Sequence, residues 1–268
     1  MRVAVCIKRI ADPEVPVSMF SIDRAGNRAV FRDGTRWVVS PFDEQAIEAA
    51  LRIRDDLGEV EIVAVTLGAE DSLAALKAAL ALGADSGVLL SDPLFEGGDF
   101  FATALPLARA IERLGDIDLV LTGRQAADTD CGAVGIGIAE LLAIPAVSFA
   151  RRIVIEDGRA VVDRVLDDGF ETLGVEPPVL VTVAHELGPP RPASLRETMR
   201  ASRKPITVWT AADLGLKPAQ VGAAGARRTV ERIYRPETEA RCEFVRAESI
   251  DRIAIDLAQR LRQDGLLP

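Results

Sequence analysis

Short apolar runs alternate with helix-length amphipathic segments through the first two-thirds of the chain. Three runs rich in β-branched residues predict buried strands at Val3–Ile7, Ile62–Leu67 and Leu119–Thr122. Helical periods follow at residues 40–51, 70–82 and 100–114. This order predicts a doubly wound α/β fold around a parallel sheet. Ligands bind such sheets beyond the carboxyl ends of the strands, so the loops that follow the three strands are candidate sites.

Residues at the helix boundaries support this interpretation. The segment Ser40-Pro41-Phe42-Asp43 has the order of a helix start, with serine at the cap and proline in the first turn. Gly83 and Gly115 are typical of helix ends. Pro106 is expected either to kink the helical segment 100–114 or to mark its true start.

The pattern changes after Ala150. Two strand-like runs, Arg151–Glu156 and Ala160–Leu166, flank Asp157-Gly158, which is a hairpin signal. Two further runs, Phe170–Val175 and Val179–Val183, are separated by prolines. We expect all four to form an antiparallel extension of the same sheet.

The last 60 or so residues carry too few periodic apolar positions to form a core of their own, although residues 248–261 have a helical period. We expect this C-terminal region to pack on another surface. The domain division that follows is an α/β domain over residues 1–188, a loop over 189–205, and a C-terminal arm over 206–268.

The composition of the chain argues against several classes of function. The 268-residue chain has 32 basic and 41 acidic residues and a net charge of −9, which argues against general nucleic-acid binding. The three cysteines, Cys6, Cys131 and Cys242, form no metal-binding or dithiol spacing, and one must stay unpaired. We expect no metal site, no membrane insertion and a reducing, cytoplasmic location.

The segment 118–135 carries the densest candidate chemistry. It follows a predicted strand with a glycine-bearing loop and then a helix through Ile138 and Leu142. Glycines let the backbone approach a phosphate, and free N–H groups at a helix start favour an anion. The residues alone leave open whether this loop binds an anion or is only a tight strand-to-helix turn.

Catalytic interpretations of single residues are weaker than structural ones. Asp128 and Asp130 precede a helix, where carboxylates cap N–H groups and complement the helix dipole. His185, the only histidine, and Cys131 have no neighbouring catalytic partner in the sequence. We expect no catalytic residue in this chain.

Residues 189–205 have five basic residues and one acidic residue. The spacing of Leu195 and Met199 places both on one face of a short helix. Apolar anchors surrounded by arginines suit a docking element, and the alternative is a solvated loop. The candidate recognition residues are Arg191, Leu195, Arg196, Met199 and Arg200.

Together these segments resemble the beta subunit of electron-transfer flavoprotein. The stretches that carry the resemblance extend to about Leu216 and are Val5-Cys6-Ile7-Lys8-Arg9, Ser40-Pro41-Phe42-Asp43-Glu44, residues 123–131, residues 168–173 and residues 192–201.

The resemblance implies a Rossmann-like adenine-nucleotide-binding fold and a heterodimer with an alpha subunit that holds the redox FAD. It implies that the beta subunit binds AMP structurally and that Leu195 inserts into a partner flavin dehydrogenase. The electrons would pass to a quinone reductase or another acceptor. The implied nucleotide-binding residues are Cys6, Ser40, Pro41, Phe42, Asp43, Leu67, Gln125, Ala126, Asp128, Thr129, Asp130, Cys131, Gly132, Ala133, Val134 and Gly135.

Several residues depart from the family pattern and leave alternatives. Ser40 stands where the family commonly has Asn, Leu67 replaces a common Cys, and Ala127 replaces Ile. The sequence falls between two family patterns: Asp130-Cys131 favours that of AMP-binding members, and Ala133-Val134-Gly135 that of electron-bifurcating members, which place a second FAD here and oxidise NADH. A stand-alone adenine-nucleotide-binding sensor protein is the third hypothesis.

Overall fold

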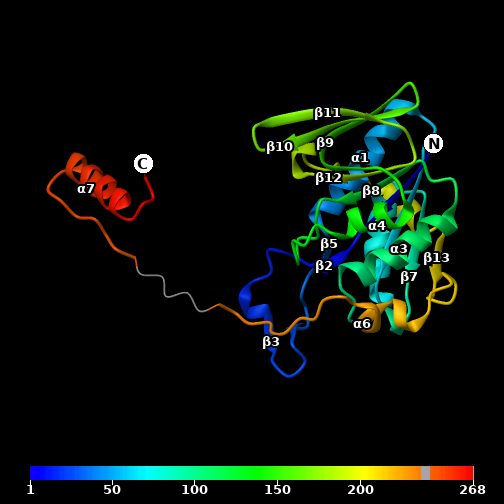
Figure 1. Cartoon of the computed structure of the whole chain (residues 1–268), viewed down its shortest axis with the longest axis horizontal. Helices are drawn as coiled ribbons and strands as arrows, with labels where there is room; N and C mark the ends of the chain where they lie inside the picture. The colour runs from blue at the N-terminus through cyan, green and yellow to red at the C-terminus, as the bar shows by residue number, and fades with distance from the viewer. Residues whose placement is uncertain (237–241, 268) are drawn as a thin grey trace.

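A single large sheet organises the chain. The computed structural model describes residues 1–236 and 242–267 (Figure 1). Nine strands pair in the order β11-β10-β9-β12-β8-β1-β6-β7-β13. Their bounds are β1 Arg2–Cys6, β6 Glu61–Leu67, β7 Ser86–Leu90, β8 Leu119–Gly123, β9 Ala146–Glu156, β10 Arg159–Leu166, β11 Gly169–Val175, β12 Val179–Val183 and β13 Ile206–Trp209.

Most of this sheet is parallel. The pairs β12–β8, β8–β1, β1–β6, β6–β7 and β7–β13 are all parallel. These central strands are apolar over nearly their whole length because helices cover both faces. The doubly wound α/β prediction is confirmed.

The antiparallel extension is smaller than expected. Within the nine-stranded sheet, the antiparallel pairs are β9–β10 and β10–β11. The prediction that Val179–Val183 belongs to the extension is wrong: it is β12, a fully buried parallel strand between β8 and β9. Its unbroken apolar run is the pattern of a strand covered on both faces, and that burial placed it in the centre.

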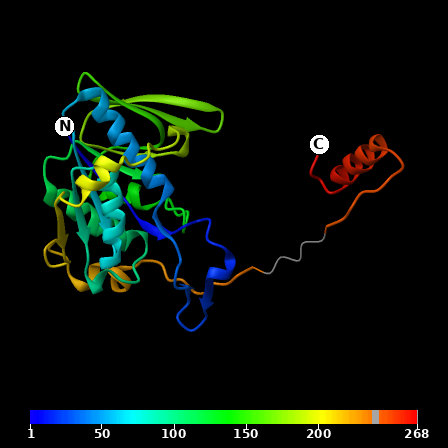
Figure 2. The same cartoon turned by 180° about the vertical axis from the view of Figure 1, so that it is seen from behind.

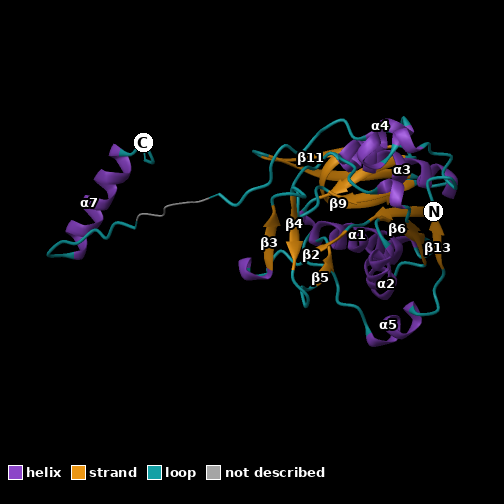
Figure 3. Cartoon of the chain, turned by 90° about the horizontal axis from the view of Figure 1, so that it is seen from below, coloured by secondary structure: helices purple, strands orange, loops and turns teal. Residues whose placement is uncertain are grey.

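Helices cover the two faces of the sheet (Figure 3). The helices α1 (Pro41–Leu57) and α2 (Leu73–Leu82) bury their apolar side chains on one face, and α3 (Phe100–Leu114) and α4 (Val134–Leu142) on the other. Asp99 caps α3 by accepting a hydrogen bond from the Ala102 N–H at 3.0 Å. Pro106 therefore lies inside α3 and does not mark its start.

A small β-structure follows β1 and was not predicted. It comprises two two-stranded sheets, one from β2 (Arg9–Ala11) and β5 (Trp37–Val39), and one from β3 (Phe20–Asp23) and β4 (Arg28–Phe31). Both pairs are antiparallel. The centre of the Phe31 ring lies 5.9 Å from that of the Phe20 ring and 5.3 Å from that of the Trp37 ring. This aromatic cluster connects the β3–β4 hairpin to β5.

The first part of the expected C-terminal arm lies on the α/β body. Strand β13 extends the parallel sheet beside β7, and the short helix α6 (Gly222–Gly225) contacts α3. Residues 227–233 still make hydrogen bonds to the body, whereas the later helix α7 (Ile250–Gln263) has no buried residue. Helix α7 stands apart from the sheet in both views (Figures 1 and 2).

The remaining helices are short. Helix α5 (Leu195–Ala201) packs beside α2. Five 3-10 turns of three residues each connect other elements among the described residues: η1 Val17–Met19, η2 Glu70–Ser72, η3 Pro93–Phe95, η4 His185–Leu187 and η5 Pro218–Gln220.

Candidate functional site

The predicted nucleotide-site residues gather at one edge of the sheet. The parallel strands β1, β6 and β8 run in the same direction, so their carboxyl ends at Cys6, Leu67 and Gly123 share that edge. The loop 124–133, which joins β8 to α4, leaves from the same edge. Segments far apart in the sequence thus surround one position, as the fold class requires.

Asp43 joins two of these strand ends from the first turn of α1. Its carboxylate accepts hydrogen bonds from the backbone N–H of Lys8 at 2.7 Å and of Gly123 at 3.1 Å. Desolvation by burial raises the pKa of Asp43 to about 7, against the lowering effect of these two hydrogen bonds. Both carboxylate oxygens are therefore occupied within the chain, and Asp43 acts by holding the strand ends together.

The loop 124–133 is ordered by its own side chains. Gln125 donates through Nε2 to Asp130 Oδ1 at 2.8 Å, and the Asp130 N–H donates to the Ala126 carbonyl at 2.9 Å. Asp130 adopts a positive φ of 49° and Gly132 one of 64°, which lets the chain reverse before α4.

Lys8 lies at the end of β1 and reaches across to the loop. Its Nζ binds both carboxylate oxygens of Asp128, at 2.9 and 2.7 Å. Asp128 and Asp130 are the two carboxylates that would repel a phosphate, and each is held by a donor from the chain. Sequence reasoning did not place Lys8 in the site, although its position directly after a buried strand was a usable signal.

Backbone donors at the start of α4 have no partner among the described residues. Among the described contacts, the N–H groups of residues 131–136 make no hydrogen bond, as expected for the first turn of a helix. Ala133 and Val134 open this nine-residue helix with no side-chain cap. The combination of free N–H groups and the helix dipole suits a phosphate.

Two glycines of this region serve packing. A Cβ on Gly123 would lie 2.6 Å from Asp43 Oδ1, and one on Gly135 would lie 2.5 Å from Thr122 Oγ1. Gly135 is buried against β8, so it brings α4 close to the sheet. For these two positions the packing interpretation accounts for the glycine.

The other predicted residues line the same edge. Ser40 is fully buried at the start of α1, and its Oγ accepts a weak hydrogen bond from the Ala127 N–H at 3.4 Å. Pro41 and Phe42 form the first turn of α1. Cys6 is buried, and desolvation with the nearby Asp43 raises its pKa to about 12. Thr129 and Cys131 are exposed on the loop.

His185 is exposed beside Glu186, with Nδ1 3.3 Å from Oε2, and lies on η4. Within the described residues, no three histidine, cysteine or acidic side chains come together as a metal site.

The predicted recognition residues form an exposed helix. Ser194 caps α5 by accepting a hydrogen bond from the Glu197 N–H at 3.1 Å. Leu195 and Met199 lie on one face, with 79% and 69% of their surface exposed. They line an open hollow of about 530 Å³ together with Arg196, Arg200 and Arg203.

Arg191 lies outside that hollow. Its guanidinium binds Glu48 at 2.8 Å and Asp55 at 2.7 Å, both on α1. Burial alone would raise the pKa of Glu48, but its hydrogen bonds from Arg191 and Arg52 lower it. Arg191 thus fastens the loop before α5 onto the body.

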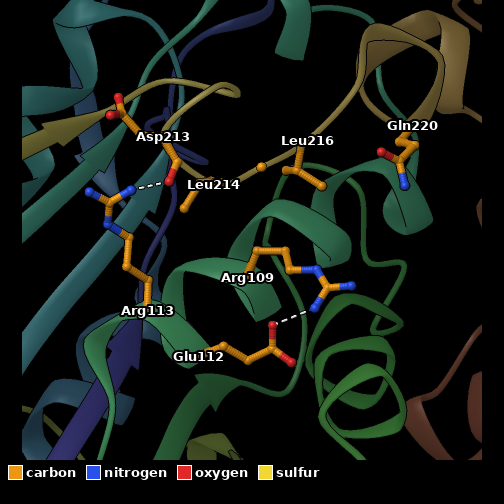
Figure 4. A pocket seen from close by; sticks show the side chains of 8 residues that line it. Arg109, Glu112, Arg113, Asp213, Leu214, Leu216 and Gln220 are labelled. Carbon is orange, nitrogen blue, oxygen red and sulfur yellow. Dashed lines mark hydrogen bonds and ion pairs between the residues drawn. The ribbon is translucent and has the colours of Figure 1, made fainter.

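A second hollow, of about 490 Å³, lies between α3 and residues 213–220 (Figure 4). Its charged side chains are already engaged: Arg109 binds Glu112 at 2.6 Å, and Arg113 donates to the Asp213 carbonyl. It contains none of the predicted site residues.

Comparison with known proteins identifies the family. A family profile described as electron transfer flavoprotein domain matches residues 29–214. The chain is 35% identical over its full length to the caffeyl-CoA reductase-Etf complex subunit CarD of Acetobacterium woodii, and covers all of that protein.

Two further relatives carry the name electron transfer flavoprotein subunit beta. One, from Thermoanaerobacterium thermosaccharolyticum, is 36% identical over 89% of this chain and 90% of its own length. The other, from Bos taurus, is 35% identical over 81% of this chain and 84% of its own. Within the described residues, every helix is too short or too polar to cross a lipid bilayer. This chain therefore belongs to the electron transfer flavoprotein family, as a beta-type subunit.

Proposed function

We propose that this chain pairs with an alpha-type subunit in a cytoplasmic heterodimer. The heterodimer accepts electrons from flavin dehydrogenases and passes them to an acceptor such as a quinone reductase. The redox FAD is held mainly by the alpha-type subunit. The division into an α/β domain, a recognition loop and a C-terminal arm belongs to the same proposal.

The proposal that this chain pairs with an alpha-type subunit rests on the C-terminal arm. Beyond residue 226, eight large apolar side chains of the described arm are exposed, namely Val230, Tyr234, Phe244, Ile250, Ile255, Leu257, Leu266 and Leu267. Such a concentration of exposed apolar surface is typical of an interaction site. In the heterodimer these side chains pack on the alpha-type subunit.

The edge around loop 124–133 holds AMP. The free N–H groups of residues 131–136 receive the phosphate, and the ion pair between Lys8 and Asp128 reduces the negative potential there. The nucleotide has a structural role: it fixes the loop against β1 and α1. No bond of the nucleotide is broken, so the site needs no acid, base or nucleophile.

The alternative occupant of this site is a second FAD, in which case the heterodimer would oxidise NADH there. Ala133-Val134-Gly135 at the start of α4 resembles the pattern of electron-bifurcating members, which favours this occupant. The full-length similarity to a subunit of a caffeyl-CoA reductase-Etf complex favours it as well.

The nucleotides released from the purified heterodimer distinguish the two occupants. The chain is co-expressed with its alpha-type partner, the complex is denatured, and the supernatant is quantified by chromatography. One FAD and one AMP per heterodimer support the structural role. Two FAD per heterodimer would mean that a second FAD occupies the site in place of AMP. Adenine nucleotide on a lone chain, with no heterodimer formed, would support a stand-alone sensor protein.

Helix α5 docks the partner dehydrogenase. Leu195 and Met199 supply apolar anchors, and the arginines around them steer a partner with an acidic surface.

Leu195→Ala tests this docking. Loss of a central apolar anchor is expected to slow flavin reduction by the dehydrogenase about tenfold or more in stopped-flow measurements. Leu57→Ala, which truncates a 44% exposed leucine at the end of α1, is the matched control and should leave the rate unchanged. An unchanged rate for Leu195→Ala, with intact flavin content, would exclude α5 as the docking element.

A further inference from the structure

Two polar contacts hold residues 227–233 of the C-terminal arm against the body. Asp99, the cap of α3, accepts through Oδ2 from the backbone N–H of Arg227 at 2.8 Å and of Arg228 at 2.9 Å. The Arg227 guanidinium also lies 3.4 Å from the centre of the Phe101 ring. The start of the arm is thereby fixed to α3.

The second contact comes from the turn of the β3–β4 hairpin. Asn27 donates through Nδ2 to the Val230 carbonyl at 2.6 Å and accepts through Oδ1 from the Ile233 N–H at 2.6 Å. One side-chain amide thus binds the backbone on both sides of residues 231–232. Figure 2 shows the arm passing beside this hairpin before it leaves the body.

The hairpin itself is well supported. Asn27 has a positive φ of 47°, and Asp23 Oδ1 accepts from the N–H groups of Ala25 and Gly26 at 3.0 Å. At the base of the hairpin, Phe31 packs on Trp37, and the Arg9 guanidinium lies 4.1 Å from the centre of the Trp37 ring. Because the hairpin packs on β5, the contact with Asn27 also connects residues 230–233 of the arm to β2 and β5.

We propose that Asn27 and Asp99 act together as a clasp that sets the departure direction of the arm and presents it to the alpha-type subunit. The clasp consists of the four hydrogen bonds between these two side chains and the backbone of residues 227–233. Ordering these residues before association reduces the entropy that binding would otherwise cost. The inference rests on the proposed pairing of the arm with the alpha-type subunit.

Asn27→Gly is the direct test, because glycine accepts the positive φ and removes only the amide. The variant is co-expressed with the alpha-type subunit, and the dissociation rate of the purified heterodimer is measured by subunit exchange. Loss of two hydrogen bonds is expected to accelerate dissociation about tenfold. Asn27→Asp, which keeps the acceptor for Ile233 but places a carboxylate against the Val230 carbonyl, should dissociate at least as fast as Asn27→Gly.

Trypsin cleavage gives a readout that needs no partner. Arg232 lies between the two residues that Asn27 binds, and Ile233 follows it, so the bond between them is a trypsin site. In the isolated chain, Asn27→Gly should be cut after Arg232 about tenfold faster, with the unfolding midpoint unchanged. Asp157→Gly is the matched control, because Asp157 has a similar positive φ of 49° in the β9–β10 turn, away from the arm.

A chain truncated after residue 236 separates the clasp from the pairing proposal. This truncation should itself accelerate heterodimer dissociation, and Asn27→Gly should then add little. If the truncation has its expected effect but Asn27→Gly in the full chain does not, the clasp is wrong and the arm still pairs. If the truncated and full chains dissociate equally fast, the pairing role of the arm is wrong, and the clasp with it.

Discussion

Asp43 is a buried carboxyl between two strand ends, and its ionisation makes stability depend on pH. Its pKa is about 7 in the folded chain, whereas the ordinary value of 3.8 applies to the unfolded chain. Between these values the folded state keeps a proton that the unfolded state has released, so the free energy of unfolding falls as pH rises. The loss is complete above about pH 7, where both states are ionised.

The Asp43→Asn variant removes this titration. Wild type is expected to lose on the order of 2–3 kcal/mol between pH 5 and pH 8 that the variant does not lose. Urea unfolding of both proteins at the two pH values gives the difference. Equal pH dependence in the two proteins would show that Asp43 ionises normally.

Cys6 is buried with a raised pKa, whereas Cys131 and Cys242 are exposed. Because the thiolate is the reactive form, iodoacetamide at pH 8 should modify Cys131 and Cys242 within minutes and leave Cys6 unmodified until the protein unfolds. Peptide mass analysis of the alkylated chain measures this. Rapid modification of native Cys6 would contradict its burial.

Single residues also show how far sequence reasoning reaches. The position of Ser40 and Asp43 at a helix start was readable from local capping rules. What Asp43 binds was not, because Lys8 and Gly123 lie 35 and 80 residues away along the chain. The engagement of Arg191 by Glu48 and Asp55 depends on the same kind of long-range contact.

At the scale of elements, the close packing of α4 against the sheet requires glycine, which has no side chain, at position 135. A Cβ on Gly135 would lie 2.5 Å from Thr122 Oγ1 and 3.2 Å from Thr182 Cγ2. Gly135→Ala is expected to destabilise the chain by about 1–2 kcal/mol, because overpacking outweighs the gain in helix propensity.

The double variant with Thr122→Ala provides the control for this substitution. Removal of Oγ1 opens the contact, so Gly135→Ala should cost less in that background than in wild type. Urea unfolding of the four proteins measures the coupling. Equal cost in both backgrounds would show that Thr122 does not restrict the position of α4.

Elements were predictable where one local signal dominated. Strands β1, β6 and β8 and helices α1 to α3 have clear periods or apolar runs. Strand β13 and the β2–β5 pair are short, and distant partners define them: β13 pairs with β7, more than 100 residues earlier. The unbroken apolar run of β12 indicated burial on both faces, but only its place between β8 and β9 shows that it is parallel.

At the scale of the whole molecule, the body and the arm differ in what holds them. The body buries two continuous apolar clusters, one on each face of the sheet. Helix α7 buries nothing, and its capping by Ser249 is local. The thin apolar pattern over the last 60 or so residues led us to expect no core of their own, and those up to residue 226 pack on the body. The contacts of Asn27 and Asp99 with the arm required the structure.

Native mass spectrometry of the complex purified with its alpha-type partner tests the central claim most directly. The account expects one copy of this chain with one alpha-type subunit, carrying the added mass of one FAD and one AMP. A lone chain or a homodimer that retains adenine nucleotide, with no alpha-type subunit bound, would contradict it.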